Sequence, residues 1–350
     1  MNNEIENYIT QMLPPELEET KSLITVLLNE KSTNRTTNLE YLERQGKFLC
    51  PINQNHRIKK NGHKNETQRY WCYHCHKSFS ITNETIAKSS TMNYNQFKTL
   101  LKCIYDYKPL TETALEVGIT ETSVFEMQIR IFEALDQLYD DVKLRGIIQA
   151  DEKYVRTSFK GFKTENMPRP SRRDGHKNLT SGISKDQVCI VAAIDSYDTL
   201  IIKVVGNGSA STEMISKALK DKIEKKSILV TDSKNSYIKF ANDNNLNLIQ
   251  IPTGEHKIDG YTINDINEIM TEISSYLYKK RGISSRHLQH HMNFIRYHKI
   301  LKYTIEYLEI NEEMYKNSLK LKIGLKSNDV YFTDMPFDID EYIKWYSMHQ

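Results

Sequence analysis

The stretch "GIIQADEKYVRTS", residues 146–158, alternates apolar with polar side chains and is rich in β-branched residues, which predicts a β-strand with Asp151 near its middle. Two more strands are expected after it, at residues 187–196 and 199–206, joined by a short turn. Helical and extended patterns then alternate, with a helix at 209–226, a strand at 227–232, a helix at 237–245, a strand at 246–252 and a helix at 262–280. This order predicts an α/β fold in which helices cover a mixed sheet.

The segment before this sheet is expected to be helical. Helices are predicted at residues 94–107, 111–117 and 121–138, with a turn at Gly118 and Thr120 as the N-cap of the last helix. The second and third helices have the spacing of a helix-turn-helix, in which the later helix can enter a DNA major groove. An ordinary helical hairpin has the same spacing, so both interpretations stay open here.

The composition is that of an ordinary soluble protein, with 350 residues, 39% apolar residues and a formal charge of only +3. The charge is unevenly distributed. Residues 47–80 contain seven Lys and Arg against one acid, and residues 276–302 contain seven Lys and Arg, four His and no acid. Two basic blocks in one chain favour a nucleic-acid partner. The sequence shows neither a membrane span nor a secretory signal, so we expect a cytoplasmic protein.

Three of the five cysteines lie within the first basic block. Cys72 and Cys75 form a Cys-x2-Cys pair, a spacing that lets two thiolates reach one zinc ion, and Cys50 supplies a third thiolate upstream. Asn53 occupies the position where a zinc ribbon normally has its other upstream cysteine. His56 is therefore the expected fourth ligand, with His63 in reserve. We predict one structural zinc ion in this module.

Both basic blocks are candidate DNA contacts. In the stretch "RYWCYHCHKSFS", residues 69–80, Arg69 and Lys77 are interleaved with aromatic side chains, as on nucleic-acid-binding surfaces. In the second block we expect Arg281, Arg286 and Arg296 to contact the DNA backbone rather than to read bases.

Two aspartates occupy expected strands of the sheet. Asp151 lies within the first strand, and Asp232 ends the buried strand "ILVTD". Carboxylates on neighbouring strands can converge at one edge of a sheet, and they are costly there unless they are paired or bind a metal ion. With a third acid from a later helix, the pair could hold two Mg²⁺ ions, the arrangement used for phosphodiester cleavage and transfer.

With "CP" at residues 50–51 and the ribbon stretch 69–80, the motifs "ADEKYV", "SKDQVCIVAAID", "ILVTDSKNSY" and "RGISSRHLQHHMNFIRY" resemble those of bacterial insertion-sequence transposases of the ISXO-like type, which have an N-terminal zinc ribbon and a DDE integrase-type core. The resemblance covers roughly residues 47–302. It implies a ribonuclease-H-like core, magnesium catalysis, and cutting and joining of DNA at the ends of a mobile element. It also implies binding to terminal inverted repeats and target DNA, a homodimer or larger assembly on DNA, and a bacterial, nucleoid-associated location.

The resemblance assigns Asp151 and Asp232 as the first two catalytic acids. The third belongs on the helix before "RGIS", where the register falls on Asn267 or Glu268. Glu268 is the prediction because it supplies a charge, Glu272 is the alternative one turn later, and Asp265 ranks after them.

The predicted organisation has five parts. They are a helical N-terminal segment (1–46), a zinc ribbon (47–82), a helix-turn-helix-like DNA-binding region (83–145), the ribonuclease-H-like DDE domain (146–302) and an acidic C-terminal tail without an assigned role (303–350). Three functions fit this organisation: an active transposase, a domesticated or inactive DNA-binding descendant of one, and a structural or regulatory zinc-ribbon protein. The first accounts for most residues and is the function that we expect.

Overall fold

The computed structural model describes most of the chain from Cys50 onward. The described residues are 50, 52–53, 55–64, 67–80, 86, 90, 92, 94–139, 142–162, 167–170, 182–255, 257–304, 314 and 329–349. The predicted N-terminal helical segment lies outside them, as does much of the acidic tail. The chain divides into two compact units, the first comprising residues 1–102, 116–118 and 311–322 and the second the remainder.

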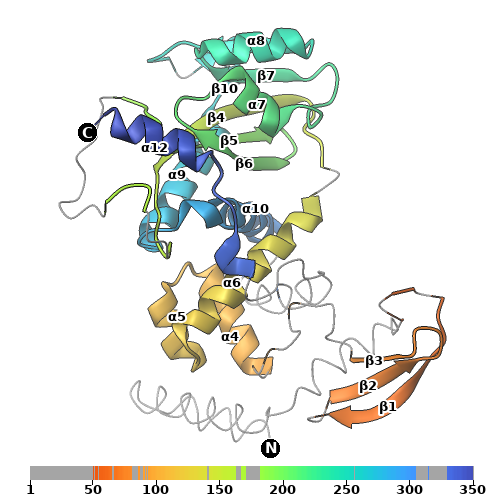
Figure 1. The fold of residues 1–350 in the computed structure, drawn as a ribbon. Coiled ribbons are helices and arrows are strands. Elements are labelled where there is room, and N and C mark those ends of the chain that lie inside the picture. Colours follow the sequence, from red (N-terminus) through yellow and green to blue (C-terminus); the bar gives the residue numbers. More distant parts are fainter. Residues whose placement is uncertain are drawn as a thin grey trace, which may run out of the picture. The chain divides into compact units, whose positions relative to one another are not determined.

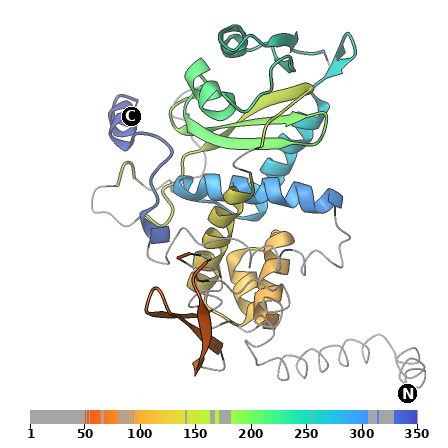
Figure 2. The ribbon, with the colours of Figure 1, turned by 90° about the vertical axis from the view of Figure 1, so that its right-hand side faces the viewer.

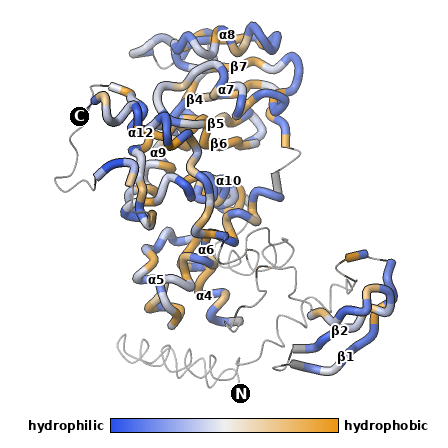
Figure 3. The backbone as a smooth tube through the Cα atoms, viewed as in Figure 1, coloured by the Kyte–Doolittle hydropathy of each residue, from blue (hydrophilic) through white to orange (hydrophobic). Residues whose placement is uncertain are grey.

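The first unit contains a small antiparallel sheet, which we call the ribbon. Its strands are β1 (Ile58–Lys64), β2 (Thr67–Cys72) and β3 (Lys77–Ser80), paired in this order. Hydrophilic residues predominate along β1 and β2 (Figure 3). The ribbon core is correspondingly small, formed by Cys50, Tyr70, Cys72 and Phe79. A sheet with so few buried apolar groups needs another source of stability, such as a bound metal ion.

The helical region follows the predicted order. It comprises α4 (Tyr94–Tyr105), α5 (Leu110–Val117) and α6 (Glu121–Leu135). Gly118 adopts the left-handed backbone that a glycine favours, and it ends α5. The predicted N-cap is confirmed, because the hydroxyl of Thr120 accepts a hydrogen bond from the N–H of Ser123. Only residues 121–123 at the start of α6 are consecutively exposed, and Met127–Phe132 are all buried.

The second unit is built on a five-stranded mixed sheet (Figure 1). Its strands are β4 (Ile147–Arg156), β5 (Gln187–Asp195), β6 (Leu200–Asn207), β7 (Ile228–Asp232) and β8 (Asn247–Ile251). The spatial order is β6-β5-β4-β7-β8, with β5 antiparallel to both neighbours and β4, β7 and β8 parallel. This order and these directions are those of a ribonuclease-H-like sheet, and they confirm the predicted fold class.

Helices cover both faces of this sheet (Figures 1 and 2). One face carries α7 (Thr212–Leu219) and α8 (Asn235–Asp243), and the other carries α9 (Asn264–Lys279) and α10 (Leu288–Thr304). The hydroxyl of Ser211 caps α7 by accepting a hydrogen bond from the N–H of Met214. A short hairpin of β9 (Lys257–Ile258) and β10 (Tyr261–Thr262) precedes α9.

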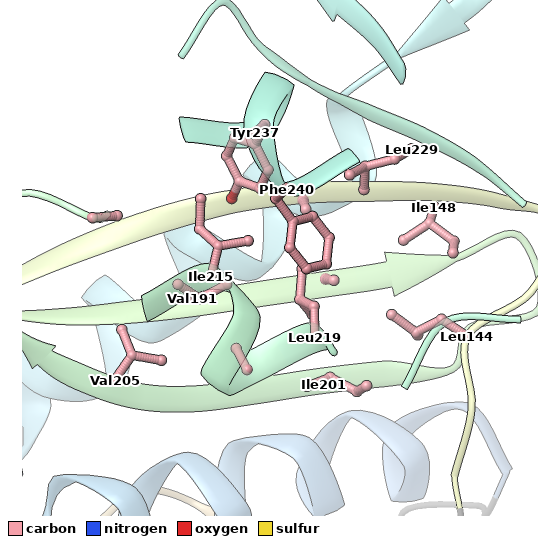
Figure 4. Packing of buried hydrophobic residues seen from close by; sticks show 14 of the residues in the cluster. Leu144, Ile148, Val191, Ile201, Val205, Ile215, Leu219, Leu229, Tyr237 and Phe240 are labelled. Atoms are coloured by element: carbon pink, nitrogen blue, oxygen red, sulfur yellow. The ribbon is translucent and has the colours of Figure 1, made fainter. Parts of the chain in front are cut away.

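Strand alternation separates the side chains of β4 between the two faces. Ile148 and Ala150 belong to the core beneath α7 and α8, where Tyr237 and Phe240 of α8 pack with them (Figure 4). Gln149 and Asp151 therefore face the side of α9. The described residues of the C-terminal tail join this unit, since the buried Tyr342 of α12 (Ile339–Ser347) donates a hydrogen bond to Asp186 over 2.9 Å. Every helix within the described ranges is too short or too polar to cross a membrane.

Candidate functional site

Cys50, His56, Cys72 and Cys75 converge at one end of the ribbon, with one ligand atom from each lying within 4.8 Å of the others. The Sγ atoms of Cys50 and Cys75 are 3.6 Å apart, and Nδ1 of His56 lies 3.1 Å from Sγ of Cys75 and 3.7 Å from Sγ of Cys72. A tetrahedral zinc site with metal–sulfur bonds of about 2.3 Å has edges of about 3.8 Å. The described cysteines form no disulfide. The donor types and spacing therefore fit one zinc ion.

A turn at residues 53–56 brings His56 to the cluster. Its N–H donates to the carbonyl of Asn53, and the side chain of Asn53 accepts from the N–H of Asn55. The turn thus moves the fourth donor three residues beyond the usual cysteine position. Burial raises the pKa of Cys50, but backbone hydrogen bonds at Asn53 and Ile52 outweigh this and lower the pKa to about 6. A low thiol pKa favours the thiolate that a metal requires. His63 lies outside this group.

The register of the central sheet places Asp151 and Asp232 side by side. The pairing of β4 with β7 joins Ile148 to Leu229 and Gln149 to Val230. Asp151 and Asp232 each lie two residues beyond Gln149 and Val230 on their strands. Leu229 and Ile148 share the core beneath α7 and α8, so the alternation puts both aspartates on the side of α9. The predicted convergence of these acids is present in the fold.

The electrostatics of this pair favour a bound cation. The pKa of Asp151 is raised to about 6, chiefly by burial and also by the neighbouring charges of Glu152 and Asp232, against the lowering effect of a backbone hydrogen bond. Oδ1 of Asp232 is buried and has no hydrogen-bond partner among the described residues. Two half-buried acids with an unpartnered oxygen are costly alone and are stabilised by divalent cations. The residues present fit magnesium.

An ion pair on the opposite face ties the two aspartate segments together. Nζ of Lys234, two residues after Asp232, lies 2.9 Å from Oε2 of Glu152, the residue that follows Asp151. The same ammonium donates to the hydroxyl of Tyr154 over 2.5 Å. Glu152 is almost fully buried, at 3% side-chain exposure, so this contact is shielded from solvent. It holds the turn after β7 against β4 and thereby fixes the spacing of the two aspartates.

The three candidate acids on α9 have different surroundings. Oδ2 of Asp265 accepts a hydrogen bond from Gln149, over 2.6 Å, on the face of β4 that carries Asp151. Oε1 of Glu268 lies 3.4 Å from Nζ of Lys299 on α10, and its side chain is 55% exposed. Among the described residues, no third acid joins the two aspartates as closely as the ribbon ligands approach one another.

The alternative acid, Glu272, is held in a buried cluster. The hydroxyl of Tyr107 donates to its carboxylate over 2.8 Å, and Nδ1 of His298 lies 3.1 Å from the same oxygen. Burial raises the pKa of Glu272, but these two hydrogen bonds outweigh it and leave the pKa lowered. Glu272 therefore already has two partners. Glu268 remains the prediction for the third acid, and Asp265 is the acid of α9 that the fold brings to β4.

A comparison with family models found a match within the second unit. Residues 143–299 match the model described as the ISXO2-like transposase domain, a range that contains both aspartates and α9. Over these residues, which are less than half of the chain, the protein is similar to an ISXO2-like transposase domain. The resemblance proposed from the sequence is confirmed for this part of the chain. No curated protein matches the chain.

Solved structures of Mos1 transposase give weak matches to the chain. The Mos1 strand transfer complex matches with 12% identity over 64% of this chain and 75% of that chain, at a TM-score of 0.26. The mariner Mos1 paired end complex with Mg matches with 12% identity over 86% of this chain and 96% of that chain, at a TM-score of 0.29. Scores this low support no statement about this chain.

The predicted DNA contacts of the transposase domain differ in accessibility. Arg281 is exposed. The guanidinium of Arg286 stacks 4.0 Å from the centre of the Phe162 ring and donates to the carbonyl of Tyr331. Arg296 is only 6% exposed, and a side chain buried to this extent does not reach a DNA backbone. Of the three arginines, the exposed Arg281 remains the predicted DNA contact.

Two features of the transposase domain were not foreseen. One is Gln149, whose Oε1 accepts from the N–H groups of Asp265 and Ile266 and so fixes the start of α9 beside Asp151. Its place two residues before Asp151, on the same face of the strand, was a usable signal. The other is the pairing of Lys234 with Glu152, which links residues 82 positions apart and leaves no local pattern.

Proposed function

We propose that this chain is a DDE-type DNA transposase of an insertion sequence, which cleaves DNA at the ends of its element and joins them to target DNA. The observation that supports this most strongly is the placement of Asp151 beside Asp232 within an ISXO2-like transposase domain. A buried carboxylate oxygen without a partner in the described structure is the chemical feature that a metal-binding centre needs and a purely structural sheet does not.

In this proposal Asp151 and Asp232 are the protein ligands of two Mg²⁺ ions. Such ions, when bound, activate the attacking hydroxyl or water and stabilise the leaving oxygen of the phosphodiester. Asp151 supplies a ligand from the middle of a rigid central strand. The turn carrying Asp232 is held by the pairing of Lys234 with Glu152, so both carboxylates keep their positions as charge builds up.

The third ligand comes from α9 in this proposal, and two acids compete for the role. Glu268 is the residue that the family register indicates, and it would have to leave Lys299 to reach the aspartates. Asp265 already lies against Gln149 on the correct face of β4. Glu268→Gln and Asp265→Asn form a matched pair, because each removes one charge from the same helix. The variant that loses cleavage identifies the ligand.

The other parts of the proposal concern the ribbon and the assembly. Cys50, His56, Cys72 and Cys75 hold one structural zinc ion, which supplies the stability that the small ribbon core lacks. Joining the two ends of one element to a target requires two active sites, so the working form is a homodimer or a larger assembly on DNA. Terminal inverted repeats and target DNA are the partners.

The test is a strand-transfer assay with duplexes copied from the DNA that flanks the gene. With Mg²⁺, the wild-type chain should nick and join these ends. Asp151→Asn and Asp232→Asn should each reduce the rate at least a thousandfold while DNA binding persists. Asp243→Asn, on the exposed end of α8, serves as the matched control and should remain active.

Two results would contradict the proposal. Cleavage that survives Asp151→Asn would exclude this residue as a metal ligand. A wild-type chain that binds the ends but never cuts them with Mg²⁺ or Mn²⁺ would favour the alternative function, an inactive DNA-binding descendant of a transposase.

A further inference from the structure

The ribbon sheet has two chemically different faces. Along β1 and β2 the alternation places Lys59 opposite Trp71 in one row, and Arg69 opposite Ser80 in the next row on the same side. We call this side the outer face, and the side chains on it include Arg57, Lys59, Arg69, Trp71, Tyr73, Ser78 and Ser80. The opposite side carries the apolar core and, through Cys72, the metal ligands.

Two cations are gathered on one aromatic ring at the end of the outer face. The guanidinium of Arg57 lies 5.6 Å from the centre of the Tyr73 ring, and Nζ of Lys59 lies 5.2 Å from it. The N–H of Tyr73 donates to the carbonyl of Arg57 over 3.1 Å, so the ring and its cations are fixed by the backbone of the sheet. All three side chains are exposed.

No described residue of the ribbon is an acid, and none of these cations forms an ion pair with a described residue. The described residues of the ribbon include only basic and uncharged side chains, with Asn61 donating to Ser78 on the outer face. Like charges held close together repel each other, and an anion bound between them removes that cost. The face is therefore complementary to a row of negative charges.

Aromatic side chains make the outer face more than a basic patch. Trp71 lies between Lys59 and Ser78 in the strand register, and the ring of His76 meets its edge with centroids 6.4 Å apart. Half-exposed aromatic rings among Lys, Arg, Asn and Ser donors are the composition of surfaces that follow a sugar–phosphate backbone. A surface for an acidic protein needs the cations alone.

We propose that the outer face of the ribbon binds the phosphate backbone of double-stranded DNA, with Arg57, Lys59 and Arg69 as phosphate contacts and Trp71 and Tyr73 packing against the sugars. The proposal deepens the proposed transposase function by naming the surface that holds the DNA. Base reading is not assigned to this face, because its charged donors are the groups that bind phosphates in any sequence.

Neighbouring lysines on β1 supply the test. Lys59 and Lys60 are both exposed, but Lys59 pairs with Trp71 on the outer face and Lys60 pairs with Tyr70 in the row of the core. Lys59→Ala and Lys60→Ala remove the same charge from the same strand, one residue apart. Zinc content of each full-length variant confirms that the ribbon is folded. Fluorescence anisotropy with a random-sequence duplex then gives the affinity at several salt concentrations.

Lys59→Ala should weaken binding three- to tenfold and reduce the slope of log affinity against log salt by about one. Lys60→Ala should change the affinity less than twofold. Equal losses of DNA affinity in both variants would show that only net charge matters. Unchanged affinity in Lys59→Ala would show that the outer face does not bind DNA. A contrast seen with poly-glutamate but not with DNA would assign the face to an acidic protein. Each of these results overturns the proposal.

The same pair is made in the Asp151→Asn background, which separates this inference from the proposed catalysis. A contrast that persists there supports the face whether or not the wild-type chain cleaves DNA. Loss of the contrast together with normal cleavage by the wild-type chain would overturn the face and leave the transposase proposal intact.

Discussion

The two basic blocks of the chain, residues 47–80 and 276–302, each contain seven Lys and Arg, yet the fold uses them in opposite ways. In the ribbon, Arg57, Lys59, Lys60 and Lys77 are all exposed. In the transposase domain, every residue from 291 to 299 is buried, because α10 packs against both the sheet and α6. The first block therefore presents its charges to a partner, and much of the second forms interior structure.

Burial also changes the charge that the second block carries. It lowers the pKa of His287 to about 3 and that of His290 to about 4, so both are neutral at pH 7. It lowers the pKa of Lys280 to about 8, and the ammonium donates to the carbonyl of Lys108. A count of basic residues overstates the positive surface of this segment. The comparison teaches that a basic block indicates a nucleic-acid partner only where its side chains reach solvent.

The largest expected effect separates the two blocks by stability. Arg296→Ala should lower the free energy of unfolding by roughly 3 kcal/mol, because it removes a buried side chain together with its packing contacts. Lys59→Ala should change that energy by at most about 0.5 kcal/mol, since its site is exposed. Urea denaturation followed by circular dichroism measures both. If the Arg296→Ala chain were as stable as wild type but bound DNA more weakly, Arg296 would be a DNA contact and not a buried structural residue.

Asp151 is a partly buried acid for which we expect the opposite effect of substitution, a gain in stability. Burial raises the pKa of Asp151 from 3.8 to about 6. Above pH 6 the carboxylate is ionised in both the folded and the unfolded chain, and its burial then lowers the stability of the folded chain. Below pH 4 it is protonated in both states, so this loss of stability is absent. Without Mg²⁺, Asp151→Asn should raise stability by about 1–2 kcal/mol at pH 7.5 and leave it unchanged at pH 4. Thermal unfolding at both pH values checks this, and equal stability at pH 7.5 would contradict it.

Zinc removal should affect only the block that is exposed. Cys72→Ser combined with Cys75→Ser should remove about one zinc ion per chain and weaken DNA binding about tenfold, because the ribbon no longer holds its outer face together. The unfolding transition of the transposase domain should remain, since the ribbon belongs to a separate compact unit. Metal analysis and calorimetry test the two halves of this prediction. Unchanged zinc content in the double variant would exclude the cluster as the site.

The strands of the large sheet could be predicted because their patterns are local. The alternation around Asp151 and the apolar run at 187–195 need no distant partner to be recognised, and the caps at Thr120 and Ser211 follow from a polar residue before a helical pattern. The four ribbon ligands were predictable for the same reason, because ligand spacing constrains them within 26 residues.

The other features depend on contacts between distant segments. The sequence of α10 places charged or histidine side chains on every side of the helix, so no amphipathic pattern indicated that it is buried. The partners of the acids on α9 follow from its rotation against β4 and α10, which puts Asp265 on Gln149 and Glu268 on Lys299. Sequence distance from the "RGIS" motif gives no information about this rotation of α9. The link from Lys234 to Glu152 likewise appears only once β7 lies beside β4.

Binding of Mn²⁺ to the full-length, zinc-loaded chain tests the central claim most directly, because it examines the Asp151–Asp232 centre without any need for the correct DNA sequence. Isothermal titration is run on wild type, Asp151→Asn, Asp232→Asn and the surface control Asp243→Asn. The account predicts saturable binding in wild type and in the control, and an affinity at least tenfold weaker in each of the other two variants. Equal Mn²⁺ binding by all four chains would contradict it.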